Sequence, residues 1–138
     1  MTLKIRALSD EEASALANGL ALAAKLVDGT VPLSTDQVQE LYDALREVDL
    51  EFAEGRIALG LAFGETIVAK AGYEWVRVSD QFGEETSLSP HGIQLACHPI
   101  TMLQKRLDRG EVVDIAELRD ETIKTIETGL ASGDYDKR

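Results

Sequence analysis

Apolar residues recur at every third or fourth position in three separate stretches of the chain, which is the spacing of an amphipathic helix. Each stretch follows a residue whose side-chain oxygen can accept a hydrogen bond from the first helical turn: Ser9, Ser34 and Asp114. A Glu or Gln stands three positions after each of them, which is the spacing of a capping box. The pattern therefore predicts three helices, each with one apolar and one charged face. Their apolar stripes are Leu16, Leu20, Ala23, Ala24 and Val27; Val38, Leu41, Tyr42, Leu45 and Val48; and Ile115, Leu118, Thr122, Ile126 and Leu130.

Residues 57–72 predict a helix of a different kind, because the eight positions from Ile57 to Gly64 carry no polar side chain. A helix that is apolar on every side usually lies buried in the centre of a protein. Gly60 and Gly64 share one face of it, and each costs about 1 kcal/mol relative to alanine in a helix. We therefore expect another element to approach this face closely, and we expect Gly72 to end the helix.

After this helix the apolar period shortens from about 3.6 to 2, as it does in strands. Residues 73–79 and 84–89 predict two strands, joined by a turn at 80–83 that has Asp and Gly at its favoured first and last positions. Residues 93–97 predict a third strand that completes an antiparallel meander. The apolar side chains on its common face are Ile93, Leu95 and Cys97.

Pro99 suits the first turn of one more short helix, which we expect to stop at Gly110. These elements together predict an α+β fold, with about five helices packed on a small three-stranded antiparallel β-meander. No repeat or linker divides the sequence, so we expect a single domain over residues 1–138. The N-terminal segment 1–8 and the tail 133–138 are expected to be flexible.

The composition indicates which kinds of partner the protein could bind and in which cellular compartment it would work. A formal net charge of −11 disfavours nucleic acid and anionic membrane surfaces. The charge either serves solubility alone or attracts a basic protein partner. Cys97 is the single cysteine, which suits a reducing compartment. The sequence shows neither a signal peptide nor an apolar stretch of membrane-spanning length, so we predict a cytoplasmic protein, either monomer or homodimer.

Glu65 is the most notable carboxylate, because it falls within the apolar helix at 57–72. A buried carboxylate needs a partner or a raised pKa, and perturbed groups favour functional sites. The simpler interpretation is a structural acceptor for a strand amide, the Trp75 indole, or a basic side chain such as Arg77 or Arg106. We favour the structural role, since no paired base accompanies Glu65 in the sequence.

Asp80, His98 and Trp75 complete the set of candidate residues, each with a structural alternative. Trp75 belongs with Tyr73 and Phe82, aromatic residues that either line a groove for a ligand or form the core beneath a sheet. The grouping of His91, Cys97 and His98 lacks the ligand spacing of a zinc site, and adjacent strand residues point to opposite faces. We therefore predict no metal site, no cofactor and no catalytic residues.

The string around Gly60, Gly64 and Glu65, the pair Glu74-Trp75, and the turn from Asp80 to Gly83 resemble the bacterial family catalogued as domain of unknown function 3806. The resemblance extends to the segment from Pro99-Ile100 to Lys105-Arg106 and covers roughly residues 40 to 120. It implies an α+β fold in a small cytosolic bacterial protein. It implies no established activity and no catalytic residues.

Two hypotheses for function follow. The first is a non-enzymatic interaction module, an immunity or regulatory protein that binds a basic partner. The alternative is a small ligand-binding protein or hydrolase that uses Glu65 with Asp80 or His98, and it requires these side chains to converge in one cleft.

Overall fold

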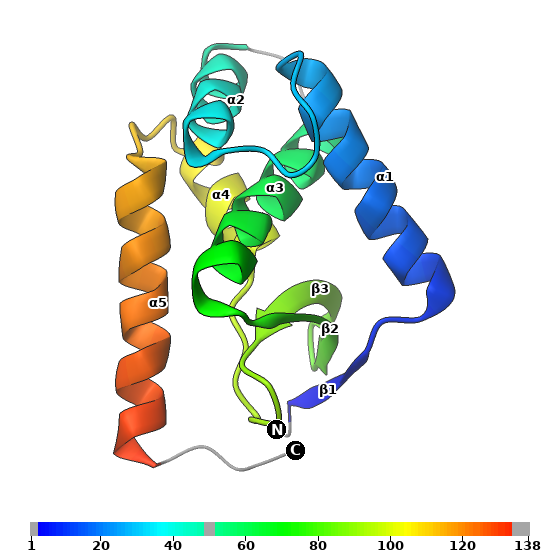
Figure 1. Ribbon diagram of the computed structural model, residues 1–138, viewed down its shortest axis with the longest axis vertical. Coiled ribbons are helices and arrows are strands. Elements are labelled where there is room, and N and C mark those ends of the chain that lie inside the picture. The colour runs from blue at the N-terminus through cyan, green and yellow to red at the C-terminus, as the bar shows by residue number, and fades with distance from the viewer. Residues whose placement is uncertain (1–2, 49–51, 134–138) are drawn as a thin grey trace.

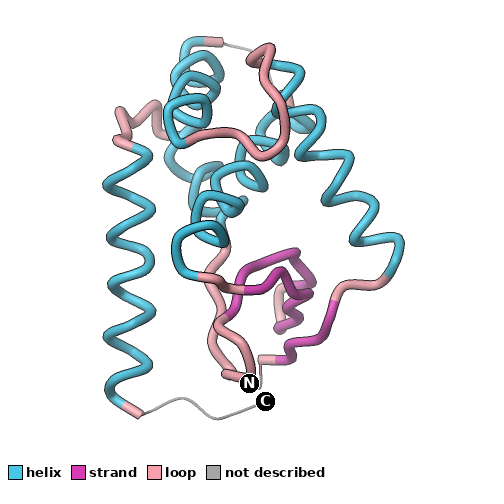
Figure 2. The backbone as a smooth tube through the Cα atoms, in the orientation of Figure 1, coloured by secondary structure: helices cyan, strands magenta, loops and turns pink. Residues whose placement is uncertain are grey.

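In a computed structural model that describes residues 3–48 and 52–133, the chain has an α+β fold with five helices and a three-stranded antiparallel sheet. Figures 1 and 2 show α3 in the middle of the molecule, with the sheet below it and the other helices around it. Among the described residues, no helix is long and apolar enough to cross a membrane. The elements are β1 (Lys4–Ala7), α1 (Asp10–Leu26), α2 (Thr35–Glu47), α3 (Ala53–Ala71), β2 (Glu74–Asp80), β3 (Gly83–Ser89), α4 (Pro99–Asp108) and α5 (Ile115–Ser132).

The three helix starts predicted from capping residues are confirmed, whereas α3 begins at Ala53, four residues before the predicted Ile57. Ser9 and Ser34 cap α1 and α2, and each forms a complete capping box with the residue three positions on. At α5 the Asp114 carboxylate accepts a hydrogen bond from the Glu117 amide over 3.1 Å. These side chains satisfy amides that have no partner within the helix, which explains why the sequence pattern located these ends well.

The apolar helix α3 is central, as predicted, and α1, α2, α4 and α5 all contact it. On the face of α3 that carries Gly60 and Gly64, residues of other elements approach the helix backbone closely. A Cβ at Gly60 would lie 2.5 Å from Ile100 Cα, and a Cβ at Gly64 would overlap the Trp75 ring and lie 3.2 Å from Pro99 Cγ. An alanine at either position would force these neighbours to shift, so close packing accounts for glycine here despite its lower helix propensity.

The third strand of the sheet is not the one that the sequence pattern predicted. β1 pairs with β2 from Lys4 opposite Ser79 to Ala7 opposite Val76, and the strand order is β1-β2-β3. The segment 1–8, expected to be flexible, therefore contains an edge strand. Apart from Gly133, the tail 133–138 lies outside the described residues.

Residues 93–97 form no continuous strand: Ile93 and Cys97 are isolated bridge residues, of which Cys97 pairs with Leu88, and residues 94–96 form a loop beside the sheet (Figure 2). The buried Ser89 hydroxyl lies 3.1 Å from the Ile93 carbonyl and 2.5 Å from the Leu95 carbonyl. The carbonyls of Ile93 and Leu95 lie against this side chain, and the segment does not form a regular hydrogen-bonded strand beside β3. The prediction of a strand at 93–97 was therefore wrong.

Candidate functional site

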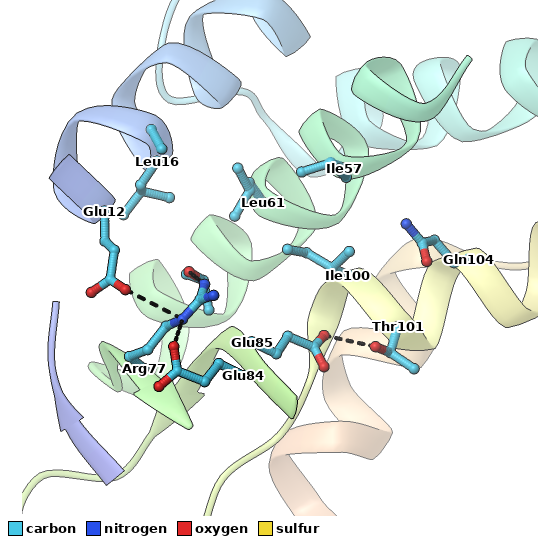
Figure 3. A pocket seen from close by; sticks show the side chains of 12 residues that line it. Glu12, Leu16, Ile57, Leu61, Arg77, Glu84, Glu85, Ile100, Thr101 and Gln104 are labelled. Carbon is cyan, nitrogen blue, oxygen red and sulfur yellow. Dashed lines mark hydrogen bonds and ion pairs between the residues drawn. The ribbon is translucent and has the colours of Figure 1, made fainter. Parts of the chain in front are cut away.

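A groove with a volume of about 400 Å³ opens between α1, α3, α4 and the β2–β3 hairpin (Figure 3). Its apolar surface comes from Leu16 on α1, Ile57 and Leu61 on α3, and Ile100 on α4. Ile57 is 41% exposed, although it belongs to the most apolar helix of the chain. The groove therefore leaves part of the central helix open to solvent.

The groove follows from the way α1 packs. The buried residues of α1 are Ala23 and Ala24, which both lie in its second half. Gly19 lies so close to Leu61 that an added methyl group would overlap the leucine side chain. The first turns of α1 are mostly exposed, and they form one wall of the groove without closing it.

Three carboxylates stand at the hairpin end of the groove: Glu12, Glu84 and Glu85. Arg77 points between the first two (Figure 3), and its Nε lies 3.3 Å from Glu12 Oε2 and 3.6 Å from Glu84 Oε2. Its Nη1 donates a hydrogen bond to Thr86 Oγ1 over 3.0 Å. Arg77 was considered as a partner for Glu65, but it binds the carboxylates of the groove instead.

Glu12 is strongly held as an anion. The Arg6 guanidinium donates two hydrogen bonds to its carboxylate, over 2.6 and 2.9 Å, and the Ser9 amide donates a third over 2.8 Å. Hydrogen bonds first from Arg6 and then from the Ser9 backbone lower the pKa of Glu12 to about 2.

A second hollow, of about 150 Å³, lies at the end of the hairpin and shares Glu84 and Glu85 with the groove. It is also lined by Asp80, Phe82 and His98. Phe82 is 88% exposed at the tip of the turn, where its amide donates to the Asp80 carboxylate over 2.7 Å. Tyr73 and Trp75, by contrast, pack in or against the core, so only Phe82 among these three aromatic residues is free to contact a partner.

His98 belongs to a cluster that joins β3 to α4. Its Nδ1 lies 2.7 Å from Ser87 Oγ and 3.6 Å from Glu85 Oε2, and Thr101 donates to Glu85 Oε1 over 2.7 Å. A serine-histidine-acid relay needs the hydroxyl and the carboxylate on opposite ring nitrogens, with an accessible hydroxyl. Here both approach the same nitrogen and Ser87 is fully buried, so the arrangement is that of a structural clamp.

Glu65 is half-buried and accepts a hydrogen bond from the Trp75 indole over 3.2 Å, which is one of the structural roles expected for it. It lines a hollow of about 280 Å³ with Lys70 and Arg119. Asp80 and His98 line the hollow at the hairpin tip, so the geometry does not bring Glu65 together with either of them.

Cys97 is buried, and desolvation raises the pKa of its thiol to about 12. It lines a hollow between α4 and α5, whereas His98 faces the hairpin, so the two neighbours point to different sides as expected. Within residues 3–48 and 52–133, no group of three or more His, Cys, Asp or Glu residues is placed to hold a metal ion.

Sequence reasoning found Asp80, Phe82 and His98 but did not find the groove. Its residues come from five elements, α1, α3, β2, β3 and α4, and Leu16, Ile57 and Ile100 each carry the apolar signal of an ordinary core position. The adjacent acids Glu84 and Glu85 were the one feature of the sequence that could have indicated the groove. Two charged residues in a row at the start of a strand place one charge on each face of the sheet.

The profile of the family described as "Domain of unknown function (DUF3806)" matches residues 36–118, and the chain belongs to this family. The matched part runs from the start of α2 to the first turn of α5, so α1 with its wall of the groove lies outside it. Comparisons with curated proteins and with solved structures gave no match.

Proposed function

We propose that the protein is a non-enzymatic interaction module that binds a basic partner protein in the groove between α1, α3 and α4. One observation carries the proposal: the groove and the hollow at the hairpin tip share Glu84 and Glu85, so an open apolar surface continues past carboxylates to the exposed Phe82. Aromatic residues surrounded by polar groups are frequent anchors of protein interfaces.

The negative charge around this surface favours a cationic partner protein. Glu12, Asp80, Glu84 and Glu85 supply four negative charges around this surface, and Arg6 and Arg77 supply two positive charges, which leaves −2. The whole chain adds a field of the same sign, with a net charge of −11. Such a field speeds the approach of a cationic partner and disfavours anionic ones.

The shape favours a segment with alternating basic and apolar side chains. Apolar side chains would pack on Leu16, Ile57 and Ile100, while lysine or arginine side chains would reach Glu84 and Glu85. An immunity or regulatory protein that blocks a cationic enzyme is the role that this chemistry fits, and the proposed place of action is the cytoplasm, where the free thiol of Cys97 would stay reduced.

Selection from a random peptide library on the immobilised protein tests the proposal. We expect enrichment of peptides that combine Lys or Arg with apolar residues, bound less tightly as salt rises. Calorimetry should then show that Glu84→Lys with Glu85→Lys weakens the selected peptides by roughly tenfold or more, and that Phe82→Ala weakens them as well.

A matched control separates the site from the total charge. Glu40→Lys with Glu127→Lys changes the net charge by the same amount at exposed positions of α2 and α5 outside the groove. It should cost much less affinity than the groove pair. Equal losses in the two double variants, or selected peptides without basic residues, would overturn the proposal.

A further inference from the structure

A hollow of about 350 Å³ lies on a different part of the molecule, between α4, α5 and the loop that precedes α4. Its apolar lining comes from Leu95 in the loop, Met102 on α4, and Leu118 and Ile126 on α5. None of the residues that line it belongs to the groove or to the hairpin hollow. Its volume is at the small end of the range of ligand pockets, about 300–1,000 Å³.

The threonine and cysteine side chains in this lining are uncharged. Thr122 donates its hydroxyl hydrogen to the Leu118 carbonyl over 2.7 Å, and Thr125 donates to the Glu121 carbonyl over 2.9 Å. The Cys97 thiol lies in the lining and is neutral, since burial raises its pKa to about 12. The interior therefore suits a hydrocarbon or aromatic group.

Arg106 supplies the charge at this hollow. It is half-buried, and its Nη1 donates to the Met102 carbonyl over 3.0 Å. Among the described residues it forms no ion pair with a carboxylate, a property that it shares with Arg46, whereas the half-buried Arg56, Arg77 and Arg119 each have at least one. A guanidinium has five N–H donors in a planar fork that matches a carboxylate, so most of its donors remain available.

Glu121 is the opposing charge in the same lining, but it is exposed. Interactions of exposed charges are weakened by water and salt, while those of half-buried charges act through a lower effective dielectric. Arg106 therefore outweighs Glu121 in the choice of ligand.

We propose that this hollow binds a small monocarboxylate with an apolar tail, the carboxylate on Arg106 and the tail among Met102, Leu118 and Ile126. A medium-chain fatty acid and a phenylalkanoate are of the right kind. This site is independent of the groove, and its occupancy requires no basic partner.

Titration of the full chain with octanoate, followed through the methyl carbons of methionine by NMR, tests the proposal. Met102 lines the hollow, and Met1 is the only other methionine in the sequence, so the spectrum contains only two methionine methyl signals to assign. We expect saturable shifts of Met102 with octanoate. Octylamine and octanol should bind at least roughly tenfold more weakly, because they lack the charge-assisted hydrogen bonds to Arg106.

Arg106→Gln should weaken octanoate by a similar factor, and Lys105→Gln, at the exposed neighbouring position, should not. Ala96→Leu, which places a larger side chain in the lining, should block octanoate without removing the charge. Circular dichroism identifies variants that fold. No saturable octanoate binding, octylamine binding as tight as octanoate, or unchanged affinity in folded Arg106→Gln would each overturn the proposal.

Discussion

Gly64 shows what a single residue decides in this fold. The absence of its side chain lets the Trp75 ring and Pro99 lie against the α3 backbone. The neighbouring Glu65 then lies within reach of the indole, to which it is hydrogen-bonded over 3.2 Å. The sequence pattern identified these residues as a motif and favoured a structural role for Glu65, and the hydrogen bond from Trp75 is a contact of that kind.

Gly64→Ala should lower the free energy of unfolding, because the added methyl overlaps Trp75 and crowds Pro99 in a packed core, a steric cost of about 1–3 kcal/mol. The gain of about 1 kcal/mol in helix propensity offsets part of this cost, so the expected net loss is up to about 2 kcal/mol. Urea denaturation, followed by the fluorescence of the single tryptophan, measures it. Ala69→Gly, at an exposed position of α3, is the control and should cost only the propensity difference. A Gly64→Ala protein that is as stable as the original would show that Trp75 can move away at no cost.

At the scale of elements, the helices were predictable and part of the sheet was not. Helix ends are determined by residues three positions apart, such as Ser34 and Gln37, and local sequence contains all that is needed. Strand pairing joins segments far apart: β1 at residues 4–7 meets β2 at residues 76–79. Four residues carry too few alternations to predict such a strand.

Ser34→Ala tests the local part of this account. The substitution removes the side-chain acceptor of the Gln37 amide at the start of α2, and it should lower the free energy of unfolding by about 1 kcal/mol. Ser34→Asp restores an acceptor at the cap and should recover most of the loss. Thermal or urea unfolding measures both. An equal loss in both variants would mean that the cap hydrogen bond is not what stabilises this position.

At the scale of the whole molecule, the acidic surface makes stability depend on pH. The pKa of Glu12 falls to about 2, chiefly through its hydrogen bond with Arg6, and the pKa of Asp120 falls to about 2, chiefly through hydrogen bonds with Arg119 and then Lys70. The ordinary values are 4.5 and 3.8, so the unfolded chain binds these protons more readily than the folded chain does. The stabilisation is present above these ordinary values and is lost as the pH falls towards 2.

We therefore expect the free energy of unfolding to fall between about pH 5 and pH 2, as depressed carboxyl pKa values require. Glu12→Gln should reduce that dependence and lower the stability at neutral pH. Urea denaturation at a series of pH values measures both effects. Glu11→Gln, at the exposed preceding position, is the control. If the two variants show the same pH profile, the network around Arg6 does not contribute in the way described.

The sequence by itself determined the class of fold, the helix starts, the central position of α3 and the membership of a family, because caps, periodicity and short motifs are local properties of a chain. Only the tertiary structure decided which segment completes the sheet, where α1 stands away from α3, and which charges meet. Glu12 and Arg77 lie 65 positions apart in sequence yet share one ion pair, and Leu16, Ile57 and Ile100 become a groove only after packing leaves them partly open. Contacts of that kind depend on how several elements fill space together, and no single stretch of sequence contains that information.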